Sequence, residues 1–174
     1  MKKMVIDAAH SEIGFKVKHL MISTVKGNFE TFQGEVNQDG EINVSLDVNS
    51  INTGNSDRDG HLKSGDFFDV ENFSTITFTS KGFKPEMSTI VGDLTIKGVT
   101  KTVELKSDYN GKGVDPWGNT KHGFEIYGSI NRTDFGLTWN AALETGGVLV
   151  SEMVTLNFDI QLLEVVEETQ AEMA

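Results

Sequence analysis

Oxygen-bearing side chains recur between Asn55 and Asp66 at the spacing of a calcium-binding loop. Asn55, Asp57, Asp59 and Asp66 take the first, third, fifth and twelfth places of the helix–loop–helix calcium motif. That motif needs a helix on each side of the loop, whereas strand-like sequence precedes and follows this one. Asp66 is also shorter than the glutamate that normally holds the ion through both oxygens. The segment therefore does not predict a calcium site.

The four histidines of the chain, His10, His19, His61 and His122, lack the spacing of a local zinc motif, and there is no cysteine to join them. Serine, histidine and aspartate occur without the strained nucleophile turn of hydrolases. No glycine-rich segment has the spacing of a phosphate-binding or dinucleotide-binding loop. We therefore expect no metal, no cofactor and no catalytic residue.

The charge balance limits the partners. The chain has 26 acidic and 15 basic residues, a net charge of −11. Nucleic acids and anionic lipid surfaces are bound through clustered lysine and arginine, so this balance argues against both. There is no apolar run long enough to cross a membrane, and Met1–Asp7 is not followed by the apolar core of a signal peptide. These features predict a cytoplasmic protein without stable membrane insertion.

The aromatic residues are mostly phenylalanine, 11 of them against two tyrosines and two tryptophans. Phenylalanine has no polar group, so this composition suits either a closed apolar core or the wall of a site for an apolar ligand. Composition alone leaves both interpretations open.

The elements that position these residues are strands, because apolar residues alternate with polar ones along most of the chain. Ile13, Phe15 and Val17 share one face, and the same period-2 pattern recurs in 42–48, 76–78, 90–94, 103–105, 124–130 and 154–162. About eight antiparallel strands, each with one polar, solvent-exposed face and one apolar face, predict an all-β barrel.

Turn residues separate the strands. Gln38–Gly40 and Ile96–Val99 predict tight hairpin turns, and Asn110–Asn119 predicts a longer glycine-rich loop. Between 52 and 72 the alternation stops, and Asp57–Lys63 predicts one or two helical turns with Asp57 as the N-cap. We expect one barrel domain over residues 1–164, followed by an acidic C-terminal tail, 165–174.

Several motifs, in this order, resemble the YceI-like family of lipocalin-like proteins associated with polyisoprenoid binding. They are Asp7–His19, Gly27–Gly34, Asn52–Gly54 with Arg58–Asp69, Phe73–Ser80, Gly92–Lys101 and Arg132–Trp139. Each motif is weak alone, and the match rests on their order over most of the chain. The resemblance implies an extended eight-stranded antiparallel lipocalin-like β-barrel with short helical segments at the barrel ends.

Such a barrel would enclose an elongated apolar tunnel, about 33 Å long for strands of about 10 residues. The inward strand positions are the expected lining: Ile13, Phe15, Val17, His19, Phe29, Phe32, Ile76, Phe78, Leu94, Phe124, Ile126, Val154, Leu156 and Phe158. Four aromatic residues would close or gate the cavity: Phe67, Phe68, Phe135 and Trp139. Arg58, His61, Arg132 and Asp134, together with His19, are candidates for a polar mouth.

The expected function is non-enzymatic binding, transport or storage of an isoprenoid-type lipid, either a polyprenyl chain or an isoprenoid quinone. One alternative is an enzyme that acts on a lipid head group with His61 or His19 as its base. Another is a solid-cored structural or stress-response module. The resemblance also implies a homodimer, for which the sequence gives no interface signal of its own.

Overall fold

The structure is a computed structural model that describes residues 1–143 and 148–166. Its helical segments are α1 (Ser56–Lys63) and the short 3-10 turns η1 (Ala8–His10), η2 (Val48–Ser50) and η3 (Arg132–Phe135). Its strands are β1 (Met4–Ile6), β2 (Glu12–His19), β3 (Ser23–Phe29), β4 (Phe32–Val36), β5 (Ile42–Asp47), β6 (Ile51–Asn52), β7 (Thr75–Ser80), β8 (Thr89–Ile96), β9 (Val99–Val114), β10 (Thr120–Asn131) and β11 (Val150–Glu164).

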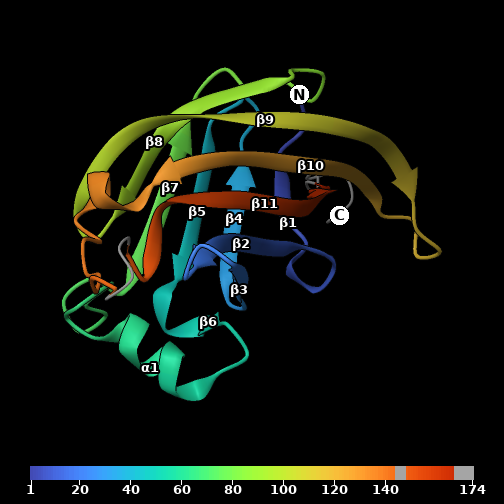
Figure 1. The fold of residues 1–174 in the computed structure, drawn as a ribbon. Helices are drawn as coiled ribbons and strands as arrows, with labels where there is room; N and C mark the ends of the chain where they lie inside the picture. The colour runs from blue at the N-terminus through green and yellow to red at the C-terminus, as the bar shows by residue number, and fades with distance from the viewer. Residues whose placement is uncertain (144–147, 167–174) are drawn as a thin grey trace.

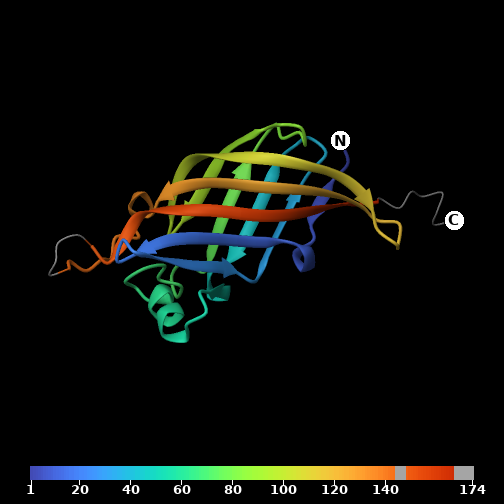
Figure 2. The ribbon, with the colours of Figure 1, turned by 45° about the vertical axis from the view of Figure 1, so that its right-hand side comes forward.

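The strands form one closed antiparallel barrel, in the order β1-β4-β5-β7-β8-β9-β10-β11, and β11 pairs with β1 to complete the ring (Figures 1 and 2). The last part of β11 pairs with β1 and the earlier part pairs with β2. β1 and β2 therefore act as one bent strand, interrupted by η1. β3 with β4, and β5 with β6, are bent in the same way. The predicted eight-stranded barrel is confirmed.

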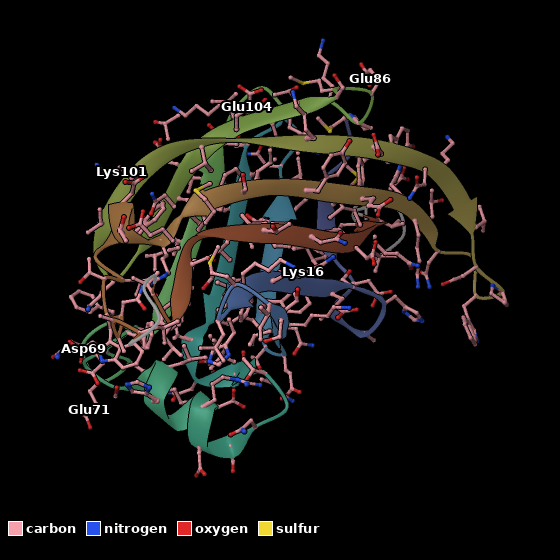
Figure 3. All side chains as sticks on the ribbon, in the orientation of Figure 1. Lys16, Asp69, Glu71, Glu86, Lys101 and Glu104 are labelled. Carbon is pink, nitrogen blue, oxygen red and sulfur yellow. The ribbon has the colours of Figure 1, made fainter. Side chains whose placement is uncertain are left out.

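The period-2 alternation separates the two faces of the wall as predicted. Ile13 and Leu105 are buried inside the barrel, whereas the alternating charged residues are exposed. Lys16, Lys101 and Glu104 are exposed strand residues on the outer surface (Figure 3).

The two predicted hairpin turns are present. Gly40, with φ of 81°, ends the turn between β4 and β5, and Lys97 and Gly98 form the left-handed turn between β8 and β9. The loop predicted over 110–119 is shorter in the structure, because β9 continues to Val114 and pairs with the start of β10. Gly111 and Gly113 were typical of a loop, but here they belong to β9, whose pairing with β10 shifts in register between Gly123 and Phe124. Gly118 lies in the turn that remains.

The helix α1 lies at one end of the barrel (Figure 1). Its N-cap is Asn55, whose side chain accepts a hydrogen bond from the backbone N–H of Arg58 at 3.0 Å. The prediction of Asp57 as N-cap is therefore wrong. Asp57 lies in the first turn, where its charge suits the positive end of the helix dipole. No helix within the described ranges is long and apolar enough to cross a membrane.

Candidate functional site

The barrel contains a cavity of about 620 Å³. This volume lies within the roughly 300–1,000 Å³ typical of small-molecule sites. Side chains from almost every strand and from α1 line it, and most of them are aliphatic or aromatic. The interior is therefore not filled by side chains, as a solid-cored module would require.

All but three of the residues predicted for the ligand site line this cavity. They are Ile13, Phe15, Val17, His19, Phe29, Arg58, His61, Phe67, Phe68, Ile76, Phe78, Leu94, Phe124, Ile126, Arg132, Trp139, Val154, Leu156 and Phe158. Their part in binding a ligand stays a prediction.

The three exceptions are Phe32, Asp134 and Phe135. Phe135 is only 1% exposed and packs in the closed core, so it does not gate the cavity. Phe32 is also a core residue, and Asp134 points to solvent from η3. For Phe32, alternation identifies the inward face of the strand but does not show how far the empty space extends along it. Asp134 and Phe135 lie in a 3-10 turn, where strand alternation does not apply.

An aromatic group lies at the α1 end of the cavity. His61 contacts Trp139 edge-on at a centroid distance of 4.7 Å, and Phe67 lies 5.3 Å from the same indole. The His61 ring is held by a 2.9 Å contact between its Nε2 atom and Asp66. Two segments distant in sequence, 61–67 and the one that contains Trp139, thus meet at one end of the cavity.

Beside this group, a short chain of hydrogen bonds fixes Arg58. Its Nε atom donates to the Thr53 hydroxyl and its Nη2 atom to the Thr53 carbonyl, both at 2.8 Å. The Thr53 hydroxyl in turn donates to Asp59 at 2.5 Å. All of this lies next to Asn55 and Asp57 in the cavity lining. The polar part of the lining is thus concentrated near α1.

Arg132 has a structural role in addition to lining the cavity. Its guanidinium is buried and donates to the carbonyl oxygens of Leu137, Trp139, Val150 and Ser151. Burial lowers the pKa of Arg132, and the nearby Glu152 opposes that shift. The arginine therefore joins the segment after η3 to the beginning of β11.

The cavity wall also contains residues that the sequence analysis did not assign to the site. Ile42, Val44 and Leu46 belong to a strand whose alternation was visible, so the same signal could have found them. Leu62 comes from α1 and Phe83 from the β7–β8 loop, where no periodic pattern exists.

Three aromatic rings pack together near the opposite end of the barrel. Phe124 lies 5.7 Å from Phe83 and 5.0 Å from Tyr109. The Tyr109 hydroxyl contacts Nδ1 of His122 at 2.6 Å, and Nε2 of His122 contacts Glu164 at 2.8 Å. Burial, and then the charge of Glu164, raise the pKa of Tyr109, while the His122 hydrogen bond lowers the pKa of Glu164.

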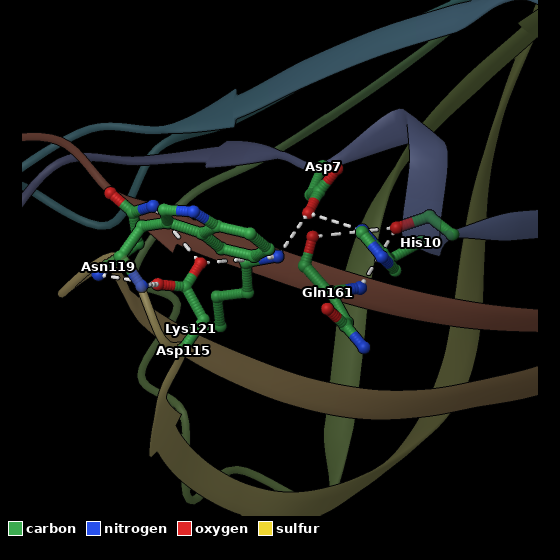
Figure 4. Close-up of polar contacts among 8 residues, drawn as sticks. Asp7, His10, Asp115, Asn119, Lys121 and Gln161 are labelled. Carbon is green, nitrogen blue, oxygen red and sulfur yellow. Dashed lines mark hydrogen bonds and ion pairs between the residues drawn. The ribbon is translucent and has the colours of Figure 1, made fainter.

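A second polar cluster at this end ties the start of the chain to β10 and β11 (Figure 4). Lys121 Nζ lies 2.7 Å from Asp7 and 3.9 Å from Asp115, while the Asp7 backbone N–H donates to the Gln161 carbonyl. The hydrogen bond from Lys121 lowers the pKa of Asp7. Within the described ranges, no group of three or more histidine and carboxylate side chains is arranged to hold a metal ion.

Comparison with known proteins gives consistent matches. A family model described as a YceI-like domain matches residues 4–162. A UPF0312 protein of Staphylococcus aureus (strain MSSA476) is 42% identical over 161 residues, which cover 88% of this chain and 93% of that protein. The structure of the Campylobacter jejuni YCEI protein has a TM-score of 0.72 at 33% identity, covering 92% of this chain and 96% of that one. A polyisoprenoid binding domain from Saccharophagus degradans has a TM-score of 0.74 at 16% identity, covering 95% and 100%, a likeness that shows the fold alone.

Proposed function

Because the chain belongs to the family of YceI-like domains, we propose that it binds an isoprenoid lipid in the barrel cavity and carries or stores it without chemical change. The observation that carries this proposal is the cavity of about 620 Å³ with its mostly apolar lining. The name of the Saccharophagus degradans domain, a polyisoprenoid binding domain, supports the same ligand class.

The lining explains the expected selectivity. Moving one CH₂ group from water to an apolar wall contributes about 0.8 kcal/mol, so a prenyl chain can bind tightly without any polar contact. A wall of this kind discriminates weakly between chains of similar length. We place the head group, quinone or other, at the α1 end, because Arg58, Thr53 and His61 are the polar groups gathered there.

The direct test is extraction of the protein purified from its own source with organic solvent, followed by mass spectrometry. We expect an isoprenoid lipid in roughly one-to-one amount. A ligand-free extract, together with no uptake of menaquinone added in detergent micelles, would rule the proposal out.

A matched pair of variants tests the position of the ligand. Phe158 lines the cavity and its neighbour Asp159 is exposed on the outer face of the same strand. Phe158→Lys puts a charge into the apolar wall and should abolish menaquinone uptake, whereas Asp159→Lys should leave uptake unchanged. Equal uptake by both folded variants would contradict binding in the cavity.

Catalysis on a head group would give a different result. It predicts turnover of the bound lipid that disappears in His61→Ala or His19→Ala, whereas carriage predicts that extracted lipid is chemically unchanged. The cytoplasmic location and the homodimer stay predictions, to be checked by cell fractionation and by light scattering.

A further inference from the structure

The hairpin between β2 and β3 ends in three consecutive exposed apolar residues. Leu20 is 37% exposed, Met21 64% and Ile22 83%. We refer to Leu20–Ile22 as the apolar tip. Clustered apolar side chains that are left in water at the end of a hairpin are typical of a surface that contacts something else.

The backbone conformation of the tip is unusual for large apolar residues. Leu20 and Met21 both have positive φ values, 56° and 61°. The backbone N–H of Ile22 donates to the His19 carbonyl at 3.2 Å, so Leu20 and Met21 are the two central residues of a β-turn. Two left-handed central residues are normally Asn-Gly or a similar pair, since residues with a large side chain disfavour the left-handed region. The tip therefore carries large apolar residues where local turn chemistry favours small polar ones.

The tip lies at the rim of the cavity. His19 and Val25, in the two strands of the hairpin, line the cavity, and so does Leu149. The backbone N–H of Leu20 donates to the Leu149 carbonyl at 2.8 Å, which joins the tip to this part of the wall. Figure 2 shows the end of β2 at the same end of the barrel as α1.

The charge of this hairpin is opposite to that of the whole chain. The hairpin, residues 12–29, contains three lysines and one acidic residue, Glu12, at the end of β2 away from the tip, although the chain has a net charge of −11. Lys16, Lys18 and Lys26 are all exposed, and Lys16 pairs with Lys26 across the hairpin. Within the described parts of the chain, none of the three is in an ion pair.

We infer that the apolar tip and the lysines behind it form a contact site for an anionic lipid bilayer, through which the cavity exchanges its lipid. The apolar side chains would enter the head-group boundary while the lysines lie against lipid phosphates. The contact is brief and peripheral, because one hairpin offers little apolar area. This inference rests on the proposed function for the purpose of the contact, since a bilayer is where an isoprenoid lipid resides.

The hairpin between β9 and β10 provides a matched control. Trp117 is 83% exposed and Val114 is 70% exposed, closely comparable with Ile22 and Met21. Neither residue lines the large cavity, and this hairpin projects from the opposite end of the barrel (Figure 2). If exposed apolar area alone determined membrane binding, both hairpins would bind a bilayer. We expect binding only through the β2–β3 hairpin.

The experiment is flotation of the full-length protein with vesicles of phosphatidylcholine mixed with phosphatidylglycerol. We expect the wild-type protein to float with the vesicles, and more weakly as salt is added. The double variant Met21→Ser, Ile22→Ser should lose at least about tenfold in partitioning, because two apolar side chains no longer enter the bilayer. The control Val114→Ser, Trp117→Ser should float like the wild type.

Equal flotation of the two double variants, or no flotation of the wild type, would overturn the inference. So would a change from dimer to monomer in the tip variant by light scattering, because the tip would then bind a second copy of the chain. Menaquinone uptake from micelles is measured in parallel and should survive in both variants, which shows that they fold. If the wild-type protein takes up no menaquinone, the proposed function is refuted, whereas the flotation result still tests the membrane contact by itself.

Discussion

The ring of Phe15 lies against Gly27, its partner across strands β2 and β3, so closely that a Cβ atom on Gly27 would be 2.5 Å from the ring carbon Cζ. The same Cβ would also lie 2.9 Å from a methyl group of Thr53. The absence of a side chain at Gly27 therefore sets the position of an aromatic ring in the cavity wall.

Replacing this glycine tests that relationship. Gly27→Ala should force the Phe15 ring toward the cavity and destabilise the fold by about 1 to 3 kcal/mol, the usual cost of overpacking. Menaquinone uptake should fall as the lumen narrows. Gly113→Ala is the control, since nothing lies within 4 Å of its added Cβ, and it should change neither quantity. Unchanged stability and uptake in Gly27→Ala would contradict the observed packing.

Removing the Arg132 guanidinium should strongly destabilise the protein. Arg132→Met removes the donor to the carbonyl oxygens of Leu137, Trp139 and Ser151, whereas the Val150 carbonyl still accepts from the Asn140 side chain. Each buried group left unsatisfied costs about 1 to 3 kcal/mol. Arg132→Lys should rescue little, because one ammonium group cannot reproduce the planar fork of donors. Urea denaturation measures the change, with exposed Lys101→Met as the control. A midpoint close to wild type in Arg132→Met would show that water replaces the guanidinium.

Substitution of Ser107 should increase the stability of the protein, in contrast to the substitutions above. Its side-chain hydroxyl is buried in β9 and has no hydrogen-bond partner among the described residues. Ser107→Ala removes that unsatisfied group and should stabilise the protein by about 1 kcal/mol, which raises Tm by about 2 to 4 °C. Calorimetry measures the shift. A lower Tm would mean that the hydroxyl is solvated in solution.

The contact between Asp7 and Lys121 predicts a loss of stability in acid. The pKa of Asp7 is lowered from its ordinary value of 3.8 by the Lys121 hydrogen bond, so the folded state binds the proton less well than the unfolded state. The stabilisation is therefore present above pH 3.8 and is lost as the pH falls through the lower folded-state pKa.

Asp7→Asn should lower Tm at neutral pH by about 2 to 4 °C, equivalent to about 1 kcal/mol. The difference from wild type should shrink well below pH 3.8, where both side chains are neutral. Asp159→Asn, on the exposed face of β11, is the control and should have no effect at either pH. A difference that persists at low pH would assign the effect of Asp7→Asn to packing instead of charge.

The sequence predicted the barrel well because its strands expose one face to water and the other to the interior. Ile13, Phe15 and Val17 could be assigned to the lumen from alternation alone. Turn residues such as Gly40 and Gly98 also located hairpins correctly, since their positive φ is a local requirement. These features depend on neighbours in sequence.

The remaining features depend on distant packing. Phe135 and Phe83 are the same type of residue, yet Phe135 is buried in the core away from the cavity, whereas Phe83 lines the cavity. Asn55 and Asp57 are both good N-cap residues, and only the backbone path selects Asn55. The bonds of Arg132 to residues up to 19 positions away were equally invisible, because they join a loop to another strand.

Closure of the ring by β1 and β11 has a consequence for how the protein is made. Met4 pairs with Glu164, about 160 residues further along the chain, so the barrel cannot close until nearly all of it has left the ribosome. Such a long-range pairing carries a large loop-closure entropy and forms late and slowly. Until then the edge of the sheet is open to pairing with other chains. The nascent chain is therefore most prone to aggregate just before its last strand is added.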